Sequence, residues 1–283
     1  MVLALVMIVS MMLAAGLQVD RENLRNTLRQ YGLLGRAFLA NFVLVPFVAV
    51  LCVWLFHVQR DVAIGIVLMS MAPGVPFLSN SAGRAEGGSL SFALTISFLF
   101  TAISIVTIPI TISLLAHVFP AVPIPVVPGR KFMTSLVAFQ LVPLVLGILV
   151  RPYLGAPAAD KAAKLLHYLF FAATLVFVVL IFPHAAGAIE KVIGHVQVFV
   201  IAGIGLFSMA AGWLLGGPDS RYRRTLSIAT LMRNIGLCVT IGSGQEFADT
   251  LVVPAILVYT LVTLALSLPL RTLYKRVPRT ATT

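Results

Sequence analysis

Apolar stretches of about twenty residues recur along almost the whole chain, and short polar segments separate them. A hydrocarbon core about 30 Å thick needs roughly 20 apolar residues for each helical crossing. Stretches bounded by charge, glycine or proline therefore predict an all-α polytopic membrane protein with nine spans. The predicted spans are 2–18, 34–56, 62–83, 89–117, 132–152, 164–183, 196–216, 225–245 and 250–273.

The composition agrees with this pattern. Hydrophobic residues make up 60% of the chain and charged residues 10%, whereas a soluble domain carries about 25% charged residues. We expect residues 1–283 to form a single transmembrane domain, with an N-terminal half of about 1–117 and a C-terminal half of about 131–273 joined by a proline-rich connection. No basic residue precedes the first apolar run, unlike a secretory signal, so this run is expected to be retained as a helix.

The distribution of basic residues predicts the orientation. With the N-terminus outside, 15 Lys and Arg fall in inner loops and the C-terminal tail and only 4 in outer loops. Because basic residues concentrate on the cytoplasmic side, we expect a multi-pass cell-membrane protein with its N-terminus outside and its C-terminus in the cytoplasm. The net charge of +11 is thus a topology signal spread over short loops, and no nucleic-acid partner is expected.

Two predicted spans contain sequence that a continuous lipid-facing helix avoids. The third carries Pro73 and Gly74 near mid-membrane, followed by Asn80, and the eighth carries Arg233 and Asn234 among glycines. A proline removes a backbone donor and clashes with the preceding turn, and hydrocarbon cannot satisfy the freed carbonyl. One such residue alone often only kinks a membrane helix. A break in each half, however, indicates the midplane site of a secondary transporter.

Arg233 is the only charged residue well inside a predicted span, because all nine acids fall in loops or at span ends. An Arg at bilayer depth costs at least about 3 kcal/mol, so it is expected to face the protein interior or a watery cavity. With no buried acid to pair with it, an incoming organic anion is the inferred partner. The alternative is a side chain that snorkels to the inner surface. The predicted substrate-binding residues are Arg233, Asn234, Asn80, Pro73 and Gly74.

Five short motifs, in this order, resemble the bile acid:sodium symporter family. They are residues 12–20, 41–46, 72–80, 90–95 and 233–237. The resemblance implies an inverted repeat with panel and core domains, two crossed discontinuous helices and, for this chain, the nine-helix form. It also implies a cavity between the domains that takes up bile-acid-like anions or small carboxylates and keto acids by alternating access.

The same resemblance suggests positions that bind sodium in the family. Side chains that match Ser79, Asn80, Ser91 and Thr95 hold one sodium ion there, and Asn41 matches an amide near the second. Ser and Thr in membrane helices often bond only to the preceding turn or to a neighbouring helix, which is the alternative for Ser91 and Thr95.

Two departures from the family pattern place sodium coupling in doubt. The family's acid, five residues before the crossover Asn, is Ala229 here, and its Gln immediately before that Asn is Arg233. A sodium ion needs oxygen ligands and usually a negative charge, and Arg supplies neither. We therefore expect no cofactor and no metal, with sodium left as an open alternative, and we hypothesise that transport is not coupled to two sodium ions or is independent of sodium.

Other classes fit the sequence less well. A membrane enzyme needs acids, a Ser/His pair or metal ligands at membrane depth, which the spans lack. Cys52 and Cys238 are expected to act as small hydrophobic residues. A channel or sensor would not need two broken helices, and an arsenite-type exporter is disfavoured because the first crossover has no cysteine. An auxin- or malate-type carrier remains an alternative, as do both monomer and homodimer.

Overall fold

The computed structural model describes residues 2–73, 88–120, 134, 137–193, 196–244, 247 and 250–276. Regular structure within these residues is helical apart from a single backbone bridge. The prediction of an all-α polytopic membrane protein is therefore confirmed. The elements are α1 (Val2–Leu17), α2 (Arg21–Leu28), α3 (Tyr31–Phe38), the π-helix η1 (Leu39–Leu44), α4 (Val45–Leu55), α5 (Arg60–Met71), α7 (Leu90–Val118), the π-helix η2 (Val137–Leu141), α9 (Val142–Leu154), α10 (Ala156–Ile193), α11 (Gln197–Leu215), α12 (Ser220–Leu231), α13 (Ile235–Gly242) and α14 (Val252–Arg276).

Each predicted span contains a described helix. Six helical stretches are long and apolar enough to cross a membrane, and α1 is a shorter apolar helix of 16 residues. The third predicted span contains α5, which ends at a break, and the eighth contains the interrupted pair α12 and α13. The main correction concerns the span 164–183, because α10 is a helix of 38 residues. The six long stretches are Tyr31–Leu55, Leu90–Val118, Val137–Leu154, Ala156–Leu180, Gln197–Leu215 and Val252–Pro269.

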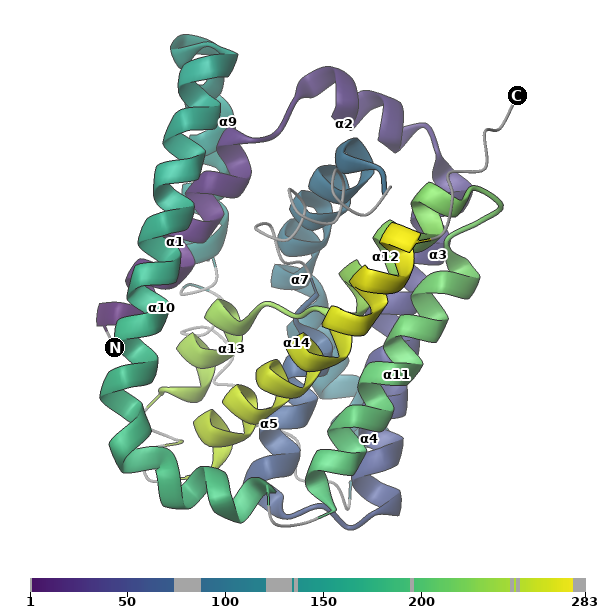
Figure 1. Cartoon of the computed structure of the whole chain (residues 1–283), viewed down its shortest axis with the longest axis vertical. Coiled ribbons are helices and arrows are strands. Elements are labelled where there is room, and N and C mark those ends of the chain that lie inside the picture. Colours follow the sequence, from purple (N-terminus) through teal and green to yellow (C-terminus); the bar gives the residue numbers. More distant parts are fainter. Residues whose placement is uncertain are drawn as a thin grey trace.

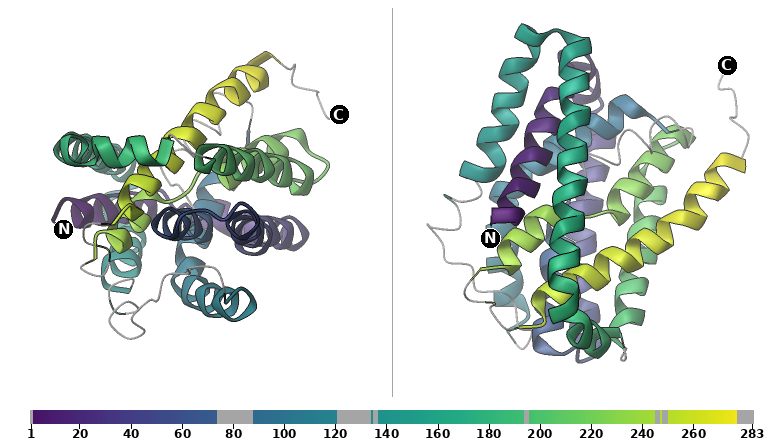
Figure 2. Two further views of the ribbon diagram at one scale, coloured as in Figure 1. Left: turned by 90° about the horizontal axis from the view of Figure 1, so that it is seen from below. Right: turned by 60° about the vertical axis from the view of Figure 1, so that its left-hand side comes forward.

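The helices pack in two groups (Figure 1). Helices α1, α9 and α10 pack on one another, and the remaining helices surround the broken helices, with α14 lying obliquely beside α5 and α11 (Figure 2). Helices α1 and α9 come unusually close at Gly16 and Gly147, where a Cβ on Gly147 would lie 2.8 Å from the Gly16 Cα. Small residues allow such close approach between membrane helices. Helices α1, α9 and α10 correspond to the panel domain that the family resemblance implies, and we call them the panel helices. The division of the chain into halves stays a prediction.

Both π-helices lie immediately before a Val-Pro pair. The prolines, Pro46 and Pro143, lack a backbone N–H and clash with the preceding turn, so the hydrogen-bond ladder widens locally. Each π-helix carries a buried amide, Asn41 in η1 and Gln140 in η2. Gln140 Nε2 donates to the carbonyl of Thr101 in α7 over 2.7 Å, which joins the two helix groups.

The polar connections lie at two opposite ends of the bundle. Helix α2, the α9–α10 turn and the α11–α12 turn lie at the upper end in Figure 1, and the α4–α5 connection and the C-terminal end of α10 lie at the lower end. The upper set carries most of the described basic residues, and the lower set carries Arg60 and Lys191. This separation is what the predicted orientation requires, and the orientation itself stays a prediction.

Candidate functional site

The segment that follows α5 and the segment that follows α12 meet backbone to backbone. Pro73, just beyond α5, and Arg233, just beyond α12, form an isolated antiparallel bridge. The backbone N–H of Asn234 donates to the carbonyl of Ala72 over 2.9 Å. Helix α12 ends because the backbone becomes extended at Met232. Each segment therefore provides a hydrogen-bond partner for a backbone group that the end of the other helix leaves free, which hydrocarbon could not do.

Asn234 starts the second half-helix. Its side-chain Oδ1 accepts a hydrogen bond from the N–H of Leu237 over 3.1 Å and so caps α13. The Asn234 side chain is fully buried, and its Nδ2 has no hydrogen-bond partner among the residues that the structure describes. The positive end of the α13 dipole consequently lies at the crossing of the two breaks.

Arg233 lies inside the bundle, with only 4% of its surface exposed, so the snorkelling alternative is wrong. Nε, Nη1 and Nη2 all lack a hydrogen-bond partner within the described parts of the chain. The Tyr259 hydroxyl of α14 lies close enough to interact electrostatically with the guanidinium, but it does not meet hydrogen-bond geometry and has no other partner among the residues described. A buried charge without a partner is costly, so this cation is the principal candidate for contact with a ligand.

Asn41, in η1, contacts the C-terminal end of α12. Its Nδ2 donates to the carbonyl of Ala37 over 3.0 Å and to the Thr230 hydroxyl over 3.2 Å, three residues before Arg233. The Asn41 Oδ1 is buried and has no partner in the described structure. The structure therefore brings this predicted amide beside the second break, although its proposed sodium role stays a prediction.

Ala229, at the position of the family's acid, lies on α12. Ala229 packs against an apolar cluster that includes Phe92 and Ile96 of α7. The same helix carries Ser91, which is half-buried, and Thr95, which is 5% exposed. No Asp or Glu is buried among the residues described. Alanine at position 229 thus keeps these apolar surroundings free of charge.

Three predicted residues fall outside the described part of the chain. Gly74, Ser79 and Asn80 belong to the stretch after Pro73, so their proposed roles stay predictions.

The first turn of α13 faces the panel helices. Gly236 has no side chain, and a Cβ there would lie 3.8 Å from the Phe170 ring of α10 and 3.9 Å from the Met11 sulfur of α1. Apolar side chains of the panel therefore lie opposite the cationic crossing.

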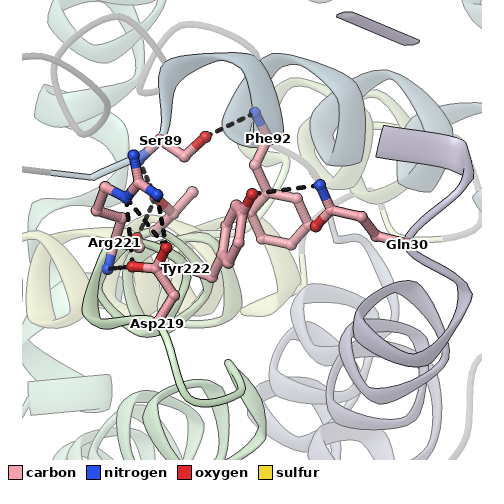
Figure 3. Close-up of polar contacts among 7 residues, drawn as sticks. Gln30, Ser89, Phe92, Asp219, Arg221 and Tyr222 are labelled. Carbon is pink, nitrogen blue, oxygen red and sulfur yellow. Dashed lines mark hydrogen bonds and ion pairs between the residues drawn. The ribbon is translucent and has the colours of Figure 1, made fainter. Parts of the chain in front are cut away.

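The loop end of α12 is fixed to its neighbours (Figure 3). Asp219 accepts from the backbone N–H of Arg221 over 2.8 Å and pairs with its guanidinium over 2.8 Å. This side-chain hydrogen bond lowers the pKa of the Asp219 carboxyl. The Tyr222 ring packs edge-on against Phe92 at 5.1 Å, and its hydroxyl accepts from Gln30 Nε2 over 3.2 Å. Helix α12 is thus held by the connection between α2 and α3 and by α7.

Sequence reasoning missed three polar residues. Tyr259 is hidden within an apolar span, and only its position beside Arg233 distinguishes it. Thr230 is a candidate only because its hydroxyl accepts a hydrogen bond from Asn41 in the structure. Gln140 could have been found, because it precedes a Val-Pro pair, as Asn41 does.

A helical bundle with crossed, interrupted helices is typical of secondary transporters, and the comparisons give the same class. A family model described as the Sodium Bile acid symporter family matches residues 5–216, and the chain belongs to this family. The match ends before α12, so Arg233 lies outside it. The "Uncharacterized sodium-dependent transporter YocS" of Bacillus subtilis (strain 168) is 22% identical over 251 residues, which cover 86% of this chain and 74% of that protein. The chain is a multi-pass membrane transporter, consistent with its not being an enzyme.

Proposed function

We propose that this transporter carries a small organic anion by alternating access, with Arg233 as the counter-charge and without obligatory sodium coupling. The single observation that carries the proposal is the chemistry of the unpartnered atoms at the crossing. Arg233 offers three nitrogens, Asn234 offers Nδ2 and Tyr259 offers its hydroxyl, and every one of these atoms can donate a hydrogen bond. A group of unpartnered donors with a net positive charge favours an anion.

A carboxylate suits this arrangement best. A guanidinium can give two parallel hydrogen bonds to the two oxygens of a carboxylate. The N-terminal end of α13 adds a favourable partial positive charge. The neighbouring Phe170 and Met11 side chains of the panel helices would face the apolar part of the substrate.

The same donors disfavour a sodium ion near Arg233, because a cation needs oxygen acceptors. The family's acid is replaced by Ala229, and the structure buries no carboxylate among its described residues. The fixed guanidinium would take over the positive charge that a bound sodium ion supplies in relatives. Sodium dependence is part of the name of YocS, and this chain is proposed to differ from that protein in this respect.

Alternating access would move the two helix groups relative to each other. The bond from Gln140 to the Thr101 carbonyl joins the groups in the present conformation and would have to break as they separate. The proposed orientation places the basic end of the bundle in the cytoplasm. The lipid bilayer and the anion are the proposed partners, and no cofactor or nucleic acid has a role.

Uptake by proteoliposomes tests the proposal. Radiolabelled taurocholate, a small keto acid and malate would be compared, each in sodium chloride and in choline chloride. We expect uptake of one anion class at nearly the same rate in both salts, and its loss in Arg233→Gln. Arg233→Lys keeps the charge without the two-pronged geometry and should retain only part of the activity.

Two results would contradict separate parts of the proposal. Strict sodium dependence would rule out uncoupled transport, and full uptake by Arg233→Gln would rule out the guanidinium as counter-charge. Transport of malate alone would favour the malate-type carrier.

A further inference from the structure

A groove runs along the surface of α11, bordered by α12 and α14. Its volume is about 440 Å³, and its lining includes Leu206, Met209, Trp213, Leu214, Ser227 and Tyr274. The Ser227 hydroxyl donates to the Met209 carbonyl over 2.9 Å and so offers no donor to a ligand. Leu206 and Leu214 are more than half exposed, which leaves the groove open sideways to the bilayer. The body of this groove suits a hydrocarbon chain.

The end of the groove nearest the α11–α12 turn is aromatic and basic. The rings of Trp213 and Tyr274 stack at 5.4 Å with an interplanar angle of 19°. The Arg223 guanidinium lies over the Trp213 ring, 5.9 Å from its centroid. Tryptophan and tyrosine collect at the boundary between hydrocarbon and headgroups. This end of the groove therefore marks the level of the lipid headgroups.

Two guanidinium groups approach the same turn. Gly217 has a φ of +83°, a conformation that favours glycine, and its carbonyl accepts a hydrogen bond from Arg223 Nε. A Cβ on Gly217 would lie 3.1 Å from Arg36 Nη2, so the Arg36 side chain reaches this turn from α3. Arg36 Nε is held by the Gly32 carbonyl at 3.0 Å. Neither arginine forms an ion pair with a carboxylate of the described residues.

We propose that this groove binds an anionic phospholipid, with the phosphate at Arg36 and Arg223 and one acyl chain along α11. Basic sites between membrane helices near the cytoplasmic surface recognise anionic headgroups. A free phosphate could contact the arginines alone, whereas a phospholipid also fills the adjoining apolar groove. The site is distinct from the helix crossing and does not depend on the transported substrate.

Tryptophan fluorescence offers a local measurement, because the chain has two tryptophans, Trp54 and Trp213. In a Trp54→Phe variant in nanodiscs, Trp213 reports on the groove. Phosphatidylglycerol or phosphatidylcholine with dibrominated acyl chains would be mixed into an unbrominated background, because bromine quenches nearby indole. We expect half-maximal quenching at a mole fraction on the order of tenfold lower for phosphatidylglycerol.

Two variants and a change of salt separate the outcomes. Arg36→Gln and Arg223→Gln, each in the Trp54→Phe background, should weaken the preference for phosphatidylglycerol. In the Trp54→Phe variant itself, 0.5 M sodium chloride should weaken this preference, because it shortens the electrostatic screening length to about 4 Å. The salt experiment needs no arginine variant to fold. Equal quenching by the two lipids, or a preference that both arginine variants and high salt leave intact, would overturn the proposal.

The matched control uses the other tryptophan. Trp54 lies on α4 and is 50% exposed, so a Trp213→Phe variant reports on an ordinary lipid-facing surface. Both brominated lipids should quench Trp54 equally. A phosphatidylglycerol preference of the same size at Trp54 would show general enrichment around a basic protein and would also overturn the proposal.

Discussion

Replacement of Arg233 by methionine should make the protein more stable and abolish transport. Methionine keeps a long, flexible side chain and removes the charge. The guanidinium is 4% exposed, and its three nitrogens have no hydrogen-bond partner in the described structure. An Arg at membrane depth costs at least about 3 kcal/mol, and little in the surroundings offsets that cost. Removal of the charge should therefore stabilise the fold by roughly 2–3 kcal/mol.

Thermal unfolding in detergent measures this effect. For a chain of this size, 1 kcal/mol corresponds to about 2–4 °C in the midpoint temperature. The Arg233→Met variant should consequently unfold roughly 4–12 °C above the parent. Proteoliposome uptake, measured on the same preparation, should fall to the background because the counter-charge for the anion is gone.

Arg151→Met is the matched control, because this arginine has partners. Its guanidinium pairs with Asp160 over 2.9 Å and donates to the Leu17 carbonyl. Loss of these contacts should lower stability by about 1 kcal/mol. The reasoning would be refuted if Arg233→Met unfolded below the parent, as Arg151→Met should, or if it transported the anion normally.

Three further predictions address the remaining features of the site and fold. Because the double variant Ala229→Glu with Arg233→Gln restores the family's acid and removes the fixed cation, it should recover part of the uptake lost in Arg233→Gln, and only in sodium; equal uptake in choline would contradict this. A Cβ on Gly147 would lie 2.6 Å from a carbonyl oxygen of α1, so Gly147→Leu should separate α1 from α9 and reduce the folded yield on size-exclusion chromatography, whereas Gly203→Leu, which faces open space, should not. Asp219→Ala should lower stability by about 1 kcal/mol near pH 7 through loss of the α12 cap. Because the folded-state pKa of Asp219 is lowered, its contribution is present above the ordinary carboxyl pKa and is lost as pH falls through the lowered value, so melting curves of parent and variant should converge in acid.

A helix in each predicted span could be expected because the bilayer imposes a simple local rule. A backbone in hydrocarbon must bond to itself, so every long apolar run becomes a helix. Hydropathy defines only the apolar part of a helix, which explains why α10 continues beyond 164–183 in both directions. Its alanine-rich ends favour helix without being counted as membrane span.

The positions of the breaks could also be predicted, since Pro73 and the Arg233–Asn234 pair disturb a helix locally. Their mutual contact could be expected only by analogy with other transporters. A hydrogen bond between Asn234 and Ala72 joins residues that are far apart along the chain. No pattern within either segment specifies the partner.

By itself, the sequence determined the class of protein, the helices and the presence of a charge at membrane depth, because these depend on residue type and local periodicity. Only the tertiary structure decided that Arg233 is buried beside Tyr259 and Asn234 with no buried acid among the described residues, and that Gln140 joins the two helix groups. The physical reason is that burial and unmet hydrogen bonds belong to the contacts between distant segments, and those contacts are set by how the helices pack.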